Sequence, residues 1–250
     1  MNTKLLVAFS AGGILMTGFG AWVASAKDMA NPDQLLEEMA QKATSLAHQT
    51  TLLRDEKQIE KLQRIYGYYL DKKMWNQVAD LFADNATFEP GQYGVYVGKA
   101  HIRHALDMLG PEGIKDGELF NHMQLQPVVH VAEDGNSAKA RSREFSQIGV
   151  FGKSAFWAEG VYENEYVKQG GVWKIQKLHY YVSFVTPYAK GWGKEVLAAR
   201  TVAPKGFEPD QPSTLLYQAY PKYFVPPFHY PNPVTGKPVQ VGTAQTEGVK

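Results

Sequence analysis

The chain has 250 residues, of which 44% are hydrophobic and 20% charged, and its formal net charge is +1. This composition is typical of a globular protein with a self-supporting core, and the balanced charge gives no electrostatic support for a nucleic-acid or anionic-membrane partner. The chain contains no cysteine, which excludes disulfides, thiolate nucleophiles, Cys-ligated zinc and lipoprotein anchoring.

Residues 1–26 have the features of a signal peptide. Lys4 precedes an uncharged apolar stretch over 5–23, and Ala24-Ser25-Ala26 forms an A-x-A cleavage site. The alternative is an uncleaved anchor helix, because the apolar stretch is just long enough to span a bilayer. Its four glycines and the A-x-A site favour cleavage. We therefore expect a periplasmic or secreted protein that makes no membrane contact after cleavage.

Apolar residues at helical spacing predict an N-terminal extension over 27–53 and three further helices. The extension contains a helix over 31–53, which Asn31 and Pro32 are suited to begin. A new helix is expected to start at Asp55, with Gln58 as its capping partner, and to reach residue 70. Shorter helices are predicted over 75–82 and 102–109, and Gly110 followed by proline ends the last one.

The apolar period then changes to that of strands. A strand or hairpin is expected over 86–97, and four long strands over 119–132, 137–151, 154–168 and 172–186. Glycine-containing turn sequences separate the four strands, which predicts hairpins and a mostly antiparallel sheet. Helices followed by a meander indicate an α+β protein rather than a doubly wound sheet.

Residues 188–250 have a different composition. Ten of the 14 prolines and nine aromatic residues lie from residue 187 onward. A disordered tail is poor in aromatic residues, so this pattern predicts an ordered but irregular C-terminal arm. We expect the arm to pack on the domain or on a second subunit, where it either covers a pocket or extends an oligomer interface.

Several motifs resemble those of SnoaL-like proteins in the nuclear transport factor 2-like superfamily. They are the stretches 69–75 with 81–88, 97–102, 122–129 and 171–175. In the third stretch, Gln126 replaces the asparagine that is usual in the family. The resemblance covers about residues 52–186 and places a domain over 54–187. It implies a cone-shaped, curved, mostly antiparallel sheet wrapped on three helices, with a deep apolar cavity.

The resemblance also implies four catalytic candidates. Tyr66 matches a tyrosine that donates a hydrogen bond to a substrate oxygen, and Asp71 matches a frequent aspartate of the family. His122 matches a histidine that acts as general acid or base. His179, on the last strand, is expected to pair with His122 across the cavity. Each has a structural alternative, such as a core tyrosine, a helix cap or a histidine on the outer face.

Four further residues are predicted to bind substrate. Arg143 and Glu144 are neighbours on one strand and point to opposite faces, so only one of them faces the pocket. Glu89 falls near a catalytic aspartate of ketosteroid isomerase, one residue out of register, and Trp157 completes the set. His101 and His104 are three residues apart but lack a third ligand, so we predict no metal site. Nor does any nucleotide or hydride-transfer motif predict a cofactor.

These observations predict an acid–base lyase of the dehydratase or C–C lyase type, or an isomerase, that acts on a hydrophobic aromatic or polycyclic substrate without a cofactor. A non-catalytic periplasmic binding protein is the main alternative, and a structural dimerisation module is a third. The family resemblance further implies a homo-oligomer formed through the outer sheet face.

Overall fold

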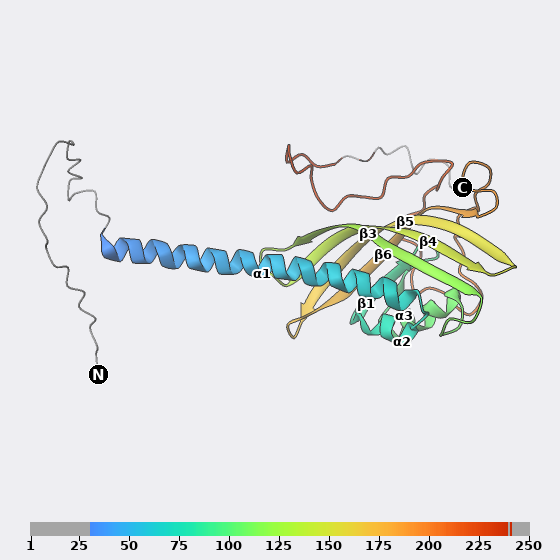
Figure 1. Ribbon diagram of the computed structural model, residues 1–250, viewed down its shortest axis with the longest axis horizontal. Coiled ribbons are helices and arrows are strands. Elements are labelled where there is room, and N and C mark those ends of the chain that lie inside the picture. The colour runs from blue at the N-terminus through green and yellow to red at the C-terminus, as the bar shows by residue number, and fades with distance from the viewer. Residues whose placement is uncertain (1–30, 240, 242–250) are drawn as a thin grey trace, which may run out of the picture. The chain divides into compact units, whose positions relative to one another are not determined.

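The computed structural model describes residues 31–239 and residue 241 (Figure 1). The predicted signal peptide and the last residues of the arm lie outside the described residues. The chain divides into two units, residues 1–46 and 47–250. In the first unit, the described residues are helical from Pro32 onward, and the second unit contains the sheet and everything that packs on it.

Helix α1 is a single helix over Pro32–Leu70, so the predicted break at Asp55 is wrong. Asp55 does not cap a new helix. Its carboxylate is buried, where it accepts hydrogen bonds from Trp173 Nε1 at 2.9 Å and Lys168 Nζ at 2.7 Å. Asp55 is therefore polar because it binds the sheet. The local capping preference alone predicted the wrong helix boundary.

Six strands form one sheet in the order β2-β1-β6-β5-β4-β3. All neighbouring pairs are antiparallel except β1 with β6. The four long strands follow the predicted segments closely, which confirms the mostly antiparallel α+β fold. The strands are β1 Phe82–Pro90, β2 Tyr96–Val97, β3 Glu118–Val131, β4 Ser137–Val150, β5 Ser154–Gln169 and β6 Val172–Pro187.

Two short helices and a 3-10 turn close one end of the core. They are α2 Trp75–Asp80, α3 Lys99–Leu106 and η1 Asp107–Leu109. Trp75 is fully buried, and its indole N–H donates to the carbonyl of Gly110 at 2.9 Å. Among the described residues, no helix has the length and apolar character needed to cross a membrane.

The sheet has two covered faces, which we call inner and outer. The inner face packs against α1 from Asp55 to Leu70, and its residues form the main hydrophobic core with Ile59, Tyr66 and Leu70. Because side chains alternate along a strand, the neighbours of these inward residues point to the outer face. On β5, for example, Tyr162 is a core residue, whereas the next residue, Glu163, contacts the C-terminal arm.

The arm, residues 188–241, is ordered and irregular within its described part, as predicted. It returns to the sheet edge at Gln211, which pairs with Val95, and Asp210 receives the backbone N–H of Val97 at 2.7 Å. Tyr217 is buried, and its hydroxyl accepts the backbone N–H of Val182 at 2.7 Å. Together with Phe224, which stacks on Tyr217 at 4.3 Å, these contacts place the arm on the outer face of the same chain.

Candidate functional site

Asp71 and His122 meet on the inner side of the sheet. Asp71 follows the last turn of α1, and its Oδ1 accepts the backbone N–H of His122 at 2.6 Å. The same oxygen lies 3.6 Å from His122 Nδ1, and both side chains are largely buried. His122 Nδ1 makes no hydrogen bond within the described residues. A carboxylate next to an imidazole is a common arrangement in proton-transfer sites, which makes this pair the leading catalytic candidate.

A buried carboxyl group lies close to this pair. Glu144 on β4 is 3% exposed and points inward, whereas its neighbour Arg143 points outward and forms an ion pair with Glu159. Tyr162 donates a hydrogen bond to Glu144 Oε2 at 3.2 Å, and Tyr180 is also hydrogen-bonded to the carboxyl group. The charge of His122 acts on Glu144 as well. We call Tyr66, Asp71, His122, Glu144, Tyr162 and Tyr180 the inner cluster.

Burial controls protonation in the inner cluster. Desolvation raises the pKa of Glu144, which favours its neutral, proton-donating form, although the nearby charge of His122 and two tyrosine hydrogen bonds oppose the shift. Desolvation also raises the pKa of Tyr66, Tyr162 and Tyr180, so these hydroxyls keep their protons. The rings of Tyr66 and Tyr162 meet edge to face at 6.0 Å. The cluster therefore combines a basic imidazole with several proton donors in a low-dielectric site.

A glycine on β5 makes room for one of these donors. A Cβ atom at Gly160 would lie 2.4 Å from the Tyr180 ring and 2.5 Å from its hydroxyl oxygen. The register between β5 and β6 also shifts at Gly160, as expected for a bulge. Gly160 thus allows Tyr180 to cross over β5 toward Glu144.

Phe120 lies between the inner cluster and a small cavity at the open end of the sheet. The ring of Phe120 is 4.2 Å from the ring of His122, and Lys73 lies over its other side at 5.1 Å. Lys73 is held by an ion pair with Glu118 at 3.0 Å. The cavity has a volume of about 140 Å³, and Phe120 itself lines it. Phe120 is therefore the residue that separates this cavity from His122.

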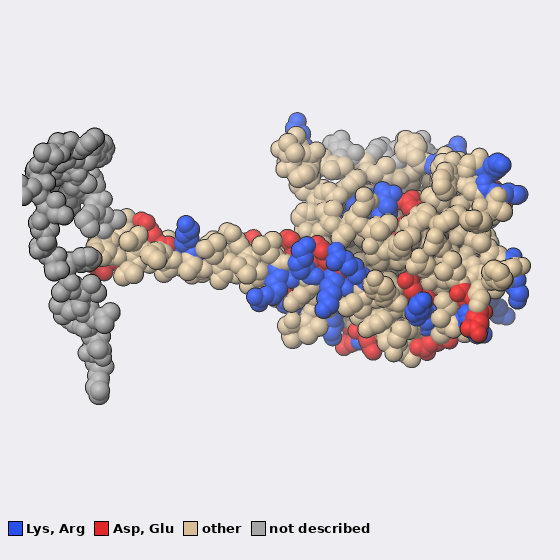
Figure 2. Space-filling view, viewed as in Figure 1, with Lys and Arg blue, Asp and Glu red and all other residues tan. Residues whose placement is uncertain are grey.

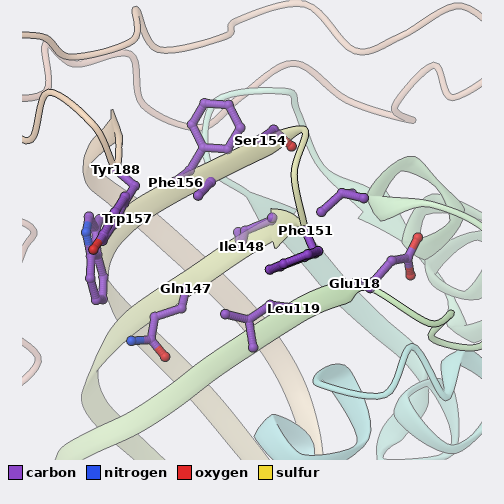
Figure 3. Close-up of a pocket in the computed structure, with 13 residues that line it drawn as sticks. Glu118, Leu119, Gln147, Ile148, Phe151, Ser154, Phe156, Trp157 and Tyr188 are labelled. Carbon is purple, nitrogen blue, oxygen red and sulfur yellow. The ribbon is translucent and has the colours of Figure 1, made fainter.

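A larger apolar cleft shares part of that lining and opens at the tips of β3, β4 and β5 (Figure 3). Its volume is about 540 Å³. Leu119, Phe151 and Trp157 contribute apolar side chains, and Tyr188 follows from the start of the arm. Trp157 stacks on Phe145 at 5.1 Å, so this predicted substrate-binding residue lies in the cleft and not beside His122. Such a cleft suits a hydrophobic molecule.

His179 and Glu89 lie elsewhere, on the outer face. They are paired across β6 and β1, with His179 Nδ1 3.4 Å from Glu89 Oε2. The prediction that His179 faces His122 across the cavity is therefore wrong. Side chains alternate along β6, and His179 lies between the inward residues Leu178 and Tyr180, so its own side chain points outward.

His101 and His104 also contact the arm. His101 Nδ1 lies 2.6 Å from Asp210 Oδ2, and His104 Nε2 lies 2.9 Å from the carbonyl oxygen of Gly206. Within residues 31–239 and 241, no group of three or more potential metal ligands is found. On the face shown in Figure 2, both basic and acidic side chains are visible along α1.

Sequence reasoning missed Tyr162 and Tyr180, two members of the inner cluster. Both lie at inward positions of predicted strands, so alternation from a correctly oriented neighbour would have found them. It also missed a buried network in which Gln63 on α1 accepts hydrogen bonds from Tyr166 at 2.7 Å and Asn164 at 3.0 Å. This network fixes the register of α1 against β5 and so positions Tyr66, one turn further along the helix.

Comparison with known proteins agrees with this fold. Residues 51–179 match the family model of the SnoaL-like domain, which spans more than half of the chain. The protein belongs to the SnoaL-like family, within the nuclear transport factor 2-like class. No curated protein sequence matches the chain.

Solved structures are similar to the chain at low sequence identity. A provisionally named scytalone dehydratase from Novosphingobium aromaticivorans has a TM-score of 0.50 and 21% identity, with 63% of this chain and 97% of that chain covered. A hexachlorocyclohexane dehydrochlorinase, LinA-type3, from Novosphingobium barchaimii has a TM-score of 0.48 and 21% identity, with 56% and 94% covered.

Proposed function

We propose that the protein is a lyase or isomerase that uses the inner cluster for acid–base chemistry on a small hydrophobic substrate. The observation that carries this proposal is the arrangement of Asp71, His122 and Glu144. The His122 imidazole lies 3.6 Å from the Asp71 carboxylate and close to Glu144, a buried carboxyl group whose pKa is raised by desolvation. Pairs of titratable groups whose environments push their pKa values apart are typical of acid–base sites.

In the lyase reaction, His122 removes a proton from a substrate carbon. The electron pair of the broken C–H bond forms a C=C bond, and the bond from the adjacent carbon to the leaving hydroxyl breaks. Glu144 donates its proton to that hydroxyl, so the products are an alkene and water. A proton then passes from His122 back to Glu144 and restores both groups. In the isomerase reaction, His122 returns the proton to a different carbon, while the tyrosine hydroxyls stabilise the intermediate oxygen.

The substrate class follows from the surroundings of the site. The cavity beyond Phe120 is lined mainly by apolar side chains, including Phe156 and Ile148, and Phe120 separates it from His122. The adjoining cleft of about 540 Å³ has room for an aromatic or polycyclic compound, and its apolar lining favours a neutral compound over a charged metabolite. The solved structure named as a scytalone dehydratase shares the fold, which is consistent with a lyase.

The test is turnover of a panel of hydroxylated diaryl dimers and hydroxysteroids by the purified chain, followed by mass spectrometry. We expect one class to lose water or a small carbonyl fragment, or to isomerise. His122→Gln should lower the rate by a factor of about 10² to 10⁴. His48→Gln is the matched control because His48 is partly exposed on α1 and precedes Tyr66, the first residue of the inner cluster, by several helical turns. Equal rates for the two variants would contradict the proposal.

A non-catalytic carrier is the second candidate, and the cleft of about 540 Å³ favours it. A carrier would retain a hydrophobic ligand without converting it. Native mass spectrometry of protein purified from cells distinguishes the two, since a carrier should show a bound small molecule of unchanged mass. In either case we propose export, from the signal-peptide features of residues 1–26, and a homo-oligomer. Cell fractionation and light scattering test these two points.

A further inference from the structure

A second cavity, of about 300 Å³, lies on the outer face between the sheet and the arm. Its sheet wall contains Glu163 of β5 with His179 and Tyr181 of β6, and its arm wall is the run Pro227-Phe228-His229. None of these residues belongs to the inner cluster. The volume is at the lower end of the range for small-molecule sites, which suits a ligand with one ring.

The arm wall of this cavity is fixed by specific contacts. The guanidinium of Arg141 lies over the Phe228 ring at 3.9 Å, a cation–π contact. His229 Nδ1 lies 2.8 Å from Glu163 Oε2, and Arg141 forms an ion pair with the same carboxylate. The charge of Glu163 is therefore already matched by its partners. These contacts keep Phe228 and His229 in place as a preformed wall.

His179 brings an unused hydrogen-bonding atom to the cavity. The residue is 3% exposed, and its buried Nε2 makes no hydrogen bond within the described part of the chain. On its other side, Nδ1 faces Glu89, whose carboxylate is fixed by Ser213 and Thr214 of the arm at 2.7 to 2.8 Å. A carboxylate at Nδ1 favours the proton on that nitrogen, which leaves Nε2 as an acceptor.

A row of charged residues lies next to His179 on the same face. Lys139, Glu165 and Lys177 are register partners across β4, β5 and β6, and all three line the cavity. Neither lysine forms an ion pair within the described residues. The row therefore has one excess positive charge. Burial and the charge of Lys177 both lower the pKa of His179, while Glu89 opposes them, so the neutral imidazole is the stable form.

We propose that this cavity is a second ligand site, for a small aromatic molecule that carries a hydroxyl and a carboxylate. The hydroxyl donates to His179 Nε2, the carboxylate binds Lys177 and Lys139, and the ring packs between Tyr181 and Phe228. Tyr181 stacks on His179 at 3.9 Å and 20°, so the two rings hold each other in place at the cavity wall. The site is separate from the inner cluster because it lies on the opposite face of β6.

The experiment is a titration of the full chain with 4-hydroxybenzoate, read from the side-chain signals of ¹⁵N-labelled histidines. We expect a saturable shift of His179 Nε2. Lys177→Gln should weaken binding about tenfold, because a hydrogen bond to a charged group is lost. Lys153→Gln makes the same change at the exposed β4–β5 turn and should leave binding unchanged. Benzoate lacks the hydroxyl and methyl 4-hydroxybenzoate lacks the charge, so each should bind about tenfold more weakly.

Three results would overturn this assignment. One is the absence of a saturable shift in the wild-type chain. Another is equal affinity of Lys177→Gln and Lys153→Gln. The third is a shift at His122 in place of His179, which would mean that the probe enters the inner side. Since the readout is binding at a different histidine, none of these results depends on whether the inner cluster is catalytic.

Discussion

The inner and outer faces of the sheet each carry a buried histidine beside a carboxylate, yet the two pairs have different surroundings. Asp71 receives one backbone N–H, and its side chain keeps 16% of its surface exposed. Glu89 is almost completely buried and receives three hydrogen bonds from Ser213 and Thr214. The role of a histidine–carboxylate pair therefore depends on what else binds the carboxylate. Glu89 binds the arm, whereas Asp71 has fewer partners and lies beside His122.

Of the changes that test this difference between the two faces, removal of the arm should have the largest effect on stability. Deletion of residues 205–250 removes the three donors to Glu89 and uncovers the aromatic surface around Tyr181. We expect a loss of at least about 3 kcal/mol in the free energy of unfolding, or failure to fold, because these hydrogen bonds and the burial of the aromatic side chains are both lost. Chemical denaturation measures it. An unchanged melting temperature and ligand binding would mean that the arm is only a tail.

A finer change tests the same contact. Ser213→Ala combined with Thr214→Ala removes two of the three donors to Glu89 and keeps the arm. Thr201→Ala, at an exposed position of the arm, is the matched control. We expect the double variant to lose about 2 to 3 kcal/mol of unfolding free energy and the control almost none. If the two are equally stable, Glu89 does not anchor the arm.

His179 should make stability depend on pH. Burial lowers its pKa from 6.5 to about 4 in the folded chain. Because the unfolded chain binds the proton first, stability is unaffected above pH 6.5 and falls as the pH drops from 6.5 toward 4. The loss is up to about 3 kcal/mol. His179→Gln should flatten this decrease, and His48→Gln, at a partly exposed position, should not. Parallel curves for all three proteins would contradict the shift.

On the inner face, Gly160→Ala should have a smaller effect. The added methyl group meets the Tyr180 ring at 2.4 Å, so Tyr180 must move away from Glu144. We expect a loss of about 1 to 3 kcal/mol, typical of overpacking. Gly193→Ala is the control because a Cβ atom there meets nothing within 4 Å. Differential scanning calorimetry measures both, and equal melting temperatures would show that Tyr180 does not need this space.

The sequence predicted the fold well because its signals are local. Alternating strands and glycine turns located β3 to β6, and the motifs around 69–88 identified the family. The break at Asp55 was wrong because the partners of that residue, Lys168 and Trp173, lie more than a hundred residues away. A capping preference carries no information about such contacts.

The site was only partly predictable for a similar reason. The family resemblance named Asp71 and His122 as separate candidates but did not predict that they meet, and alternation separated Arg143 from Glu144. Alternation alone cannot say which face is inner, and bulges within β1, β5 and β6 shift the register. His179 was therefore placed on the wrong side. The anchoring of the arm by Glu89 depends on residues 213 and 214, which no local pattern connects to β1.

The central claim is that Asp71 and His122 carry the chemistry, whereas a histidine–carboxylate pair elsewhere in the molecule does not. Asp71 and Asp210 allow a matched test, since each lies beside a histidine, His122 in the inner cluster and His101 at the arm. The measurement is the turnover rate of Asp71→Asn and Asp210→Asn on a substrate found in the panel. We predict that Asp71→Asn lowers the rate about 10²-fold or more and that Asp210→Asn leaves it within about twofold. Equal rates, or a larger loss in Asp210→Asn, would contradict the account.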